Sequence, residues 1–177
     1  AFNMPVFLEN TSKTIALAEK WFGEAVNEQN FAVVTIGHGI GSAIFIANEI
    51  YSGTNSASGE LGHMSIDPNG PLCRCGNHGC LEAMASVTAL DQMTDTLAIG
   101  ITNLVNLMDI NLVLLSGGIV ELYPEICSQI SKKVAQRRQS YFHDWSVAIK
   151  PLQIGPDAAM IGAATMLLKQ IVDGGNL

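Results

Sequence analysis

The feature that most constrains this chain is a short stretch that carries three cysteines and a histidine. It runs from His63 to Cys80 and holds Cys73 and Cys75 between them. Three thiolates and one imidazole are the ligand set of a closed, tetrahedral structural zinc site. The intervening residues are rich in Gly, Pro and Asn, so a bound metal would supply folding energy that this loop lacks. The sequence therefore predicts a zinc-binding loop, in which His78 is an alternative to His63 as the imidazole ligand.

A disulfide framework accounts for the cysteines less well. The fourth cysteine, Cys127, lies far from the loop, and its helical spacing with Ile126 and Ile130 predicts a packed thiol. Pairing would leave one loop cysteine free or would have to reach out to Cys127. Residues 1–5 show neither the basic nor the apolar region of a secretory signal, so we expect a cytoplasmic protein with reduced thiols.

The composition indicates one domain with a substantial core. The chain has 177 residues, of which 48% are hydrophobic and 14% charged, and its mean hydropathy is +0.28. No apolar run approaches the roughly 18 residues that cross a membrane, so the excess apolar surface belongs to the core or to a face that meets another domain or subunit. The net charge of −7 repels phosphate backbones, which makes this segment a poor nucleic-acid binder by itself.

Apolar periodicity and turn residues predict an α/β chain, because strands adjoin glycine turns that open onto helices. The expected elements are a helix at 12–26, strands at 31–36 and 43–47 joined by a glycine turn at 37–41, helices at 81–90 and 97–108, a strand at 112–115, one long helix at 119–134, a strand at 147–154 and a helix at 158–171.

Two carboxylates, Glu60 and Glu82, flank the predicted zinc loop. A metal-stiffened loop with acidic neighbours indicates a ligand site rather than a structural staple alone. The alternative is that Glu60 is a solvated loop residue and that Glu82 is favoured at a helix start by the helix dipole.

The residues around this loop resemble the signature of the ROK family, which groups bacterial sugar repressors with sugar kinases. The family pattern is a Gly-Glu-hydrophobic-Gly-His segment followed by CxCGxxGCLE, and the chain matches it at residues 59–63 and 73–82. Further similarities are the family's phosphate-side hairpin at 34–41, its adenosine-side turn at 115–119 and its final helix at 154–164. The resemblance implies an actin-like, ribonuclease H-like α/β domain with an inserted zinc-binding loop at 59–82.

Residue by residue, the resemblance implies a metal site and a sugar site. The implied metal ligands are His63, Cys73, Cys75 and Cys80, and the implied sugar contacts are Asn10, Glu60, His63 and Glu82. Carboxylate oxygens accept hydrogen bonds from sugar hydroxyls, and a histidine that binds zinc through one nitrogen offers the other as a fixed donor. The implied ligand is a monosaccharide or a sugar phosphate.

Two departures from the family pattern argue against catalysis. Family kinases carry an Asn-Asp pair at the position of Asn10 and Thr11, and that Asp is the general base for the attacking sugar hydroxyl. A threonine hydroxyl is too weak a base near neutral pH, and losing a positioned base costs about 10²–10⁴ in rate. His38 also stands where the kinases carry a small hydroxyl residue that faces phosphate. Sugar binding without phosphoryl transfer is what an effector domain requires.

We therefore expect residues 1–177 to form the C-terminal sugar-binding and dimerisation domain of a ROK transcriptional repressor of carbohydrate metabolism. The winged helix-turn-helix and the N-terminal half of the family fold are not among these residues, so operator DNA would be contacted only through them. A homo-oligomer, either a dimer or a tetramer, is expected. The alternatives are a kinase that phosphorylates a hexose or an N-acetylhexosamine with an unusual base, and a zinc-stabilised interaction module without a sugar role.

One further departure concerns the region between Ser86 and Leu97, where the family usually has several more helical turns than this chain. The resemblance places that region near the subunit contacts, so the shortening bears on the expected dimer surface.

Overall fold

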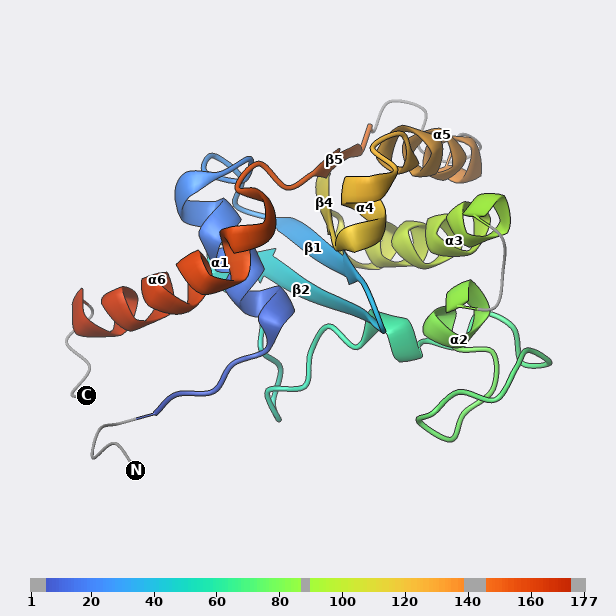
Figure 1. Ribbon diagram of the computed structural model, residues 1–177, viewed down its shortest axis with the longest axis horizontal. Helices are drawn as coiled ribbons and strands as arrows, with labels where there is room; N and C mark the ends of the chain where they lie inside the picture. The colour runs from blue at the N-terminus through green and yellow to red at the C-terminus, as the bar shows by residue number, and fades with distance from the viewer. Residues whose placement is uncertain (1–5, 87–89, 139–145, 173–177) are drawn as a thin grey trace.

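The computed structural model describes residues 6–86, 90–138 and 146–172. Its centre is a five-stranded sheet with the strand order β3-β2-β1-β4-β5 (Figure 1). The strands are β1 (Phe31–Ile36), β2 (Ile40–Ile46), β3 (Glu49–Ile50), β4 (Leu112–Ser116) and β5 (Ala148–Pro151). The first three strands pair antiparallel, whereas β4 pairs parallel with both β1 and β5. The α/β class predicted from the sequence is confirmed.

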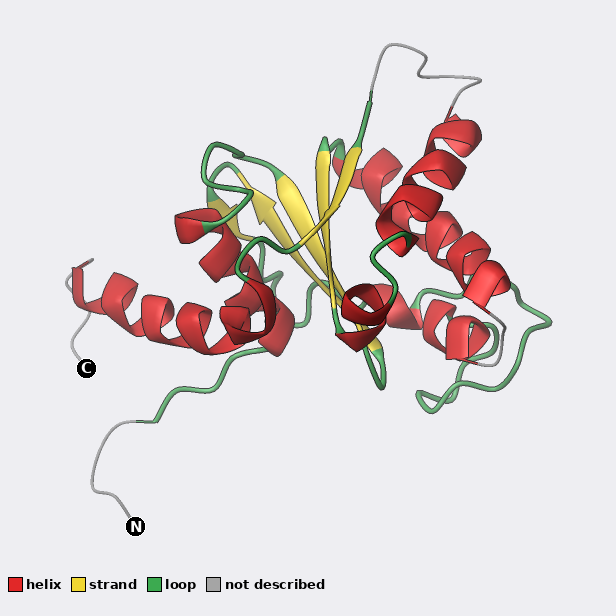
Figure 2. Cartoon of the chain, turned by 45° about the horizontal axis from the view of Figure 1, so that its top comes forward, coloured by secondary structure: helices red, strands yellow, loops and turns green. Residues whose placement is uncertain are grey.

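Helices cover both faces of this sheet (Figure 2). The helical elements are α1 (Thr11–Phe22), η1 (Leu61–His63), α2 (Leu81–Ser86), α3 (Leu90–Met108), α4 (Gly118–Leu122), α5 (Ile126–Arg138), η2 (Gly155–Asp157) and α6 (Ala158–Val172). α1 and α6 pack together on one face, and α3 and α5 pack together on the other. Within the described residues, no helix is long and apolar enough to span a bilayer.

The core consists of two apolar clusters, one on each side of the sheet. Val33 and Leu114 belong to the cluster under α1, whereas Val34 and Leu115 belong to the larger cluster under α3 and α5. Neighbouring residues fall on opposite sides because side chains alternate along a strand. Both central strands are therefore buried on both faces, which explains their nearly continuous apolar sequence.

Asn10 caps the start of α1, and the helix ends earlier than predicted. The Asn10 side-chain oxygen accepts a hydrogen bond from the Ser12 backbone N–H at 2.8 Å, which satisfies a donor that the first turn leaves unpaired. The helix stops at Phe22 rather than at residue 26. Gly23 leaves the helical conformation there, and its N–H closes the last turn on the Glu19 carbonyl oxygen.

The single long helix predicted for residues 119–134 is wrong. The structure has two helices, α4 and α5, separated at Tyr123 and Pro124. Proline lacks an N–H and disfavours the helical conformation of the residue before it. Tyr123 accordingly leaves that conformation, with φ −130° and ψ 76°. The apolar spacing continues on both sides of the break, so periodicity alone did not reveal it.

Other differences concern where elements begin and end. α3 begins at Leu90 rather than at residue 97. The helix predicted for 81–90 is α2, which ends at Ser86, and residues 87–89 lie outside the described part of the chain. β2 begins at Ile40 rather than at residue 43, and β5 covers Ala148–Pro151 rather than residues 147–154.

Candidate functional site

The loop between η1 and α2 is held by backbone contacts rather than by an apolar core. Ser65 and Cys80 form an isolated bridge across its base. Gly79 has φ +60°, and a Cβ there would lie 1.5 Å from the Asp67 carbonyl oxygen, so only glycine fits this turn. Figure 1 shows that the loop extends from the domain next to α2, at the end of the sheet that carries the β1–β2 turn.

This loop brings the four predicted metal ligands together. One ligand atom from each of His63, Cys73, Cys75 and Cys80 lies within 4.8 Å of the others. His63 Nδ1 is 3.5 Å from Cys73 Sγ, and Cys75 Sγ is 3.6 Å from Cys80 Sγ. A tetrahedron with zinc–sulfur bonds of about 2.3 Å has edges of about 3.8 Å, so the set could hold a four-coordinate ion. His78 lies outside this set and contacts a backbone carbonyl oxygen instead.

The surroundings differ among the three thiols. Cys73 and Cys80 are buried, whereas Cys75 is exposed. Burial, together with hydrogen bonds to the other two thiols, raises the pKa of the Cys80 thiol to about 12. A backbone hydrogen bond at Asn77 lowers the pKa of the Cys75 thiol. The buried thiol therefore stays protonated until a cation converts it to a thiolate.

Glu82 opens α2 and is almost fully engaged by protein donors. The residue is 8% exposed. Its Oε2 accepts hydrogen bonds from the Ile40 N–H at 2.8 Å and from Arg74 Nη2 at 3.1 Å, and its Oε1 accepts from Arg74 Nε at 2.8 Å. The carboxylate thus links the metal loop to the β1–β2 turn. Sequence reasoning missed this contact, which forms only when the loop brings Arg74 next to Glu82.

Glu60 and His63 lie close together at the two ends of the short helix η1. Glu60 Oε2 is 4.0 Å from His63 Nε2, and the two side chains are 58% and 26% exposed. Because His63 turns its Nδ1 toward Cys73, its Nε2 remains available on the Glu60 side. The arrangement allows His63 to bind a metal through one nitrogen and to present the other to a ligand.

Asn10 and Thr11 belong to a different element, the start of α1. The Asn10 side-chain oxygen is occupied as the helix cap, and Thr11 is exposed as the first helical residue. Lys13 lies on the same helix and is 2% exposed, which sequence reasoning did not single out. Its Nζ donates to the Ser56 carbonyl oxygen at 3.1 Å, in the loop that leads to Glu60. This bond joins the start of α1 to the Glu60 side of the site.

The two turns that resemble nucleotide-side elements lie at the same end of the sheet. His38 is exposed in the β1–β2 turn and lines a hollow of about 430 Å³ together with Gly118 of α4. The β4–α4 turn contains Gly117, which has φ +116°. A Cβ there would lie 1.9 Å from the Ile36 carbonyl oxygen, so this turn also requires glycine.

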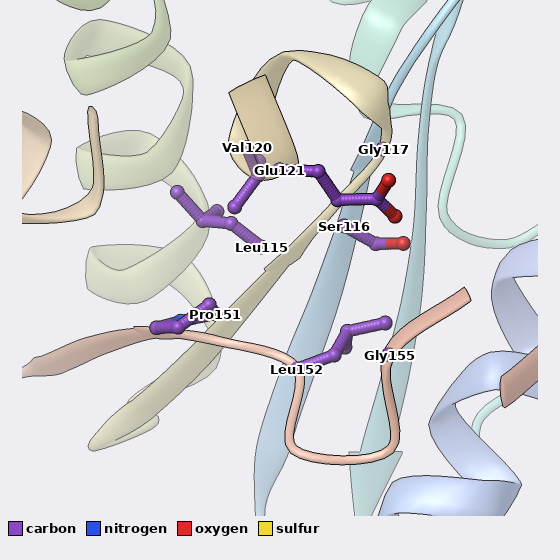
Figure 3. Close-up of a pocket in the computed structure, with 8 residues that line it drawn as sticks. All are labelled: Leu115, Ser116, Gly117, Val120, Glu121, Pro151, Leu152 and Gly155. Atoms are coloured by element: carbon purple, nitrogen blue, oxygen red, sulfur yellow. The ribbon is translucent and has the colours of Figure 1, made fainter. Parts of the chain in front are cut away.

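A small cavity lies beside the β4–α4 turn. Its volume is about 80 Å³, well below the roughly 300–1,000 Å³ of ligand pockets. Figure 3 shows its lining, which consists of Leu115, Ser116, Gly117, Val120, Glu121, Pro151, Leu152 and Gly155. A carboxylate at a small, mainly apolar cavity does not favour a nucleotide phosphate there.

Known proteins that resemble this chain include both repressors and kinases. The model of the ROK family matches residues 1–96 and 88–170. The chain is 32% identical to the xylose repressor of Bacillus subtilis, in an alignment that covers 97% of this chain and 53% of the repressor. The crystal structure of the ROK hexokinase from Thermus thermophilus matches with a TM-score of 0.81 at 27% identity, covering 96% of this chain and 67% of that one.

A third similar protein, a ROK family transcriptional regulator described as a homologue of the Escherichia coli MLC protein, matches with a TM-score of 0.72 at 26% identity. That match covers 97% of this chain and 56% of the regulator. Repressor-like and kinase-like relatives therefore share the fold found here.

The chain spans about half the length of the curated repressors that it matches, 53% in the case of the Bacillus subtilis protein. That alignment runs over 203 residues, more than the 177 of this chain, so it includes repressor residues that have no counterpart here. The two stretches matched by the family model overlap at residues 88–96, within the region between Ser86 and Leu97 that was expected to be shorter than in the family. These matches, with the observed sheet and its helices, establish the expected actin-like α/β fold, and the chain belongs to the ROK family.

Proposed function

We propose that this chain is the sugar-binding and oligomerisation domain of a ROK transcriptional repressor and that it does not phosphorylate its ligand. The observation that carries the proposal is Thr11, the first helical residue of α1 next to Asn10. The family kinases carry a carboxylate base at that position. The 32% identity with a xylose repressor over 97% of the chain supports the same conclusion.

The residues that would contact a sugar are Asn10, Glu60, His63 and Glu82. Glu60 and Glu82 supply acceptors for hydroxyl groups, and His63 supplies a donor through Nε2. Charged acceptors form short, strong hydrogen bonds with hydroxyls, which suits the recognition of adjacent hydroxyls on a sugar ring. Glu60 is half exposed and approachable, whereas Glu82 has little free capacity because Arg74 and Ile40 already donate to it.

We propose that the metal is zinc, held by His63, Cys73, Cys75 and Cys80. Four protein ligands fill a tetrahedral site and leave no open position, so the ion would act structurally and not as a Lewis acid. Its contribution would be to fix the loop and, through Nδ1, the orientation of the His63 ring.

A sugar kinase remains the second candidate, because the hexokinase structure matches with a TM-score of 0.81. Two features weigh against it. The base position holds Thr11, and the imidazole of His38 occupies the phosphate-side turn. Loss of the base alone would reduce phosphoryl transfer by about 10²–10⁴.

The partners follow from the same proposal. The domain would form a homo-oligomer in the cytoplasm and would meet operator DNA only through an N-terminal domain. Its net charge of −7 supports DNA contact through another domain, since an acidic domain repels the DNA backbone.

A thermal-shift screen on the full-length protein tests this function. D-xylose, D-glucose, N-acetylglucosamine and their phosphates are added singly, with sugar-dependent ATP turnover measured in parallel. A ligand at a hundred times its Kd contributes about 2.7 kcal/mol, which raises the Tm by about 5–10 °C. Glu60→Gln should remove most of the shift, whereas Glu125→Gln, an exposed carboxylate before α5, should retain it. Sugar-dependent ADP formation would support the kinase instead.

A further inference from the structure

Arg74 holds a position that neither the metal site nor the sugar site explains. It lies between Cys73 and Cys75, so its backbone is fixed on both sides by residues that would bind the metal. Its side chain contacts Glu82 through two hydrogen bonds, from Nε to Oε1 and from Nη2 to Oε2. Paired bonds of this kind fix the orientation of both groups, because the guanidinium is planar and rigid.

The Arg74–Glu82 pair also packs against the β1–β2 turn. A Cβ on Gly39 would lie 2.5 Å from Glu82 Oε2 and 2.8 Å from Arg74 Nη2, so this turn is packed directly against the pair. The next residue, Ile40, donates its N–H to the same Oε2. A continuous series of contacts therefore runs from the metal ligands through Arg74 and Glu82 to the turn.

The stability of the fold does not account for this arrangement. Arg74 is 67% exposed, and ion pairs with an exposed partner contribute about 0–1 kcal/mol. What the contact with Arg74 does fix is the orientation of the Glu82 carboxylate. A carboxylate has about four acceptor positions. Arg74 takes two of them and the Ile40 N–H takes a third, which leaves one for a ligand hydroxyl.

We infer that Arg74 is a positioning residue, which transmits the rigidity of the metal loop to Glu82 and leaves one acceptor position directed at the ligand. This inference rests on the proposed sugar-binding function. It adds that Glu82 accepts a single hydroxyl, and that loss of the metal and loss of Arg74 weaken ligand binding by the same route.

The experiment compares Arg74→Gln and Arg74→Lys in the full-length protein, with D-xylose as the probe. Arg74→Gln should retain its zinc and bind D-xylose about tenfold more weakly, the effect of losing hydrogen bonds to a charged group. Arg74→Lys, which keeps the charge but cannot form the paired contact, should recover part of the affinity. Lys150→Gln is the matched control, because it removes the cation of a distant ion pair with Glu24 and should leave D-xylose binding unchanged.

Hydrogen exchange at the Ile40 amide provides a readout that needs no sugar. Exchange should accelerate in Arg74→Gln and in zinc-depleted wild type, and zinc depletion of Arg74→Gln should add little. If wild type fails to bind D-xylose, the choice of ligand is wrong, while the exchange data still decide the role of Arg74. Unchanged Ile40 exchange, tighter D-xylose binding or loss of zinc in Arg74→Gln would each overturn the inference.

Discussion

At the scale of single residues, the Cys80 thiol should make the proposed metal binding depend on pH. Burial raises its pKa to about 12, so the metal-free protein carries the proton throughout the neutral range. Zinc requires the thiolate, so binding releases that proton and zinc affinity rises with pH, about tenfold per pH unit for each proton released. Competition with a chelating dye at pH 6.5 and 7.5 measures this rise. Cys127→Ser should behave as wild type, because that thiol lies outside the cluster. An affinity independent of pH would exclude thiolate ligation by Cys80.

Thr11 supports a second prediction at this scale. The first turn of α1 carries no acidic residue, so its N-terminal dipole is uncompensated by charge. Thr11→Asp should stabilise the helix by about 0.3–1 kcal/mol and raise the Tm by about 1–4 °C. Thr11→Asn has a similar shape without the charge and should give a smaller change. A Tm lower than that of wild type in calorimetry would show that the carboxylate is repelled there, and the nearby Glu9 would be the cause.

At the scale of elements, α1 and α6 pack at a glycine. A Cβ on Gly162 would lie 1.7 Å from the Thr14 carbonyl oxygen, so the two helices have no room for a side chain at this point. Gly162→Ala should therefore destabilise the protein by about 1–3 kcal/mol through overpacking, although alanine is the better helix former. Gly118→Ala in α4 is the control, because nothing lies within 4 Å of a Cβ there. Equal unfolding midpoints in urea for the two variants would contradict the close approach.

The buried carboxylate of Glu19 connects α1 to the segment before η2. It is 0% exposed, and its two oxygens accept the backbone N–H groups of Glu24 and Ile154, both at 2.9 Å. Glu19→Ala leaves both donors without this partner and should cost about 2–5 kcal/mol. Glu19→Gln keeps one acceptor and should cost less. If urea unfolding shows that Glu19→Ala lowers the free energy of unfolding by less than about 0.5 kcal/mol, as substitutions at ordinary surface sites do, then water replaces the carboxylate.

The sequence predicts an element well when the signal for it lies in neighbouring residues, and poorly when the element depends on contacts between residues far apart in the chain. The hairpin, the strand at β4 and the clustering of His63 with the three loop cysteines were predictable, because alternation, apolar runs and cysteine spacing are local signals. The break at Pro124 was present in the sequence but was masked by apolar spacing that continued past it. The contact of Arg74 with Glu82 was not predictable, because it exists only once the loop has closed.

At the scale of the whole molecule, the metal loop and the sheet should respond separately to metal removal. The two apolar clusters lie against the sheet, and the loop packs Ile66 against the larger one, whereas its buried Cys73 and Cys80 belong to neither cluster. Chelation should therefore accelerate hydrogen exchange across residues 64–80, while β1 and β4 stay protected. Cys75→Ser should reproduce this pattern without a chelator. Loss of protection throughout the sheet would show that the metal stabilises the entire domain.

The parallel pairing of β1 with β4 has a consequence for the newly made chain. β1 and β2 can form their hairpin as soon as both have left the ribosome, but β4 begins only at Leu112. At about 5–20 residues per second, the inner edge of β1 stays open for about 4–15 s. During that interval an apolar strand has one edge of backbone donors and acceptors unpaired, and such an edge can pair with another chain and aggregate.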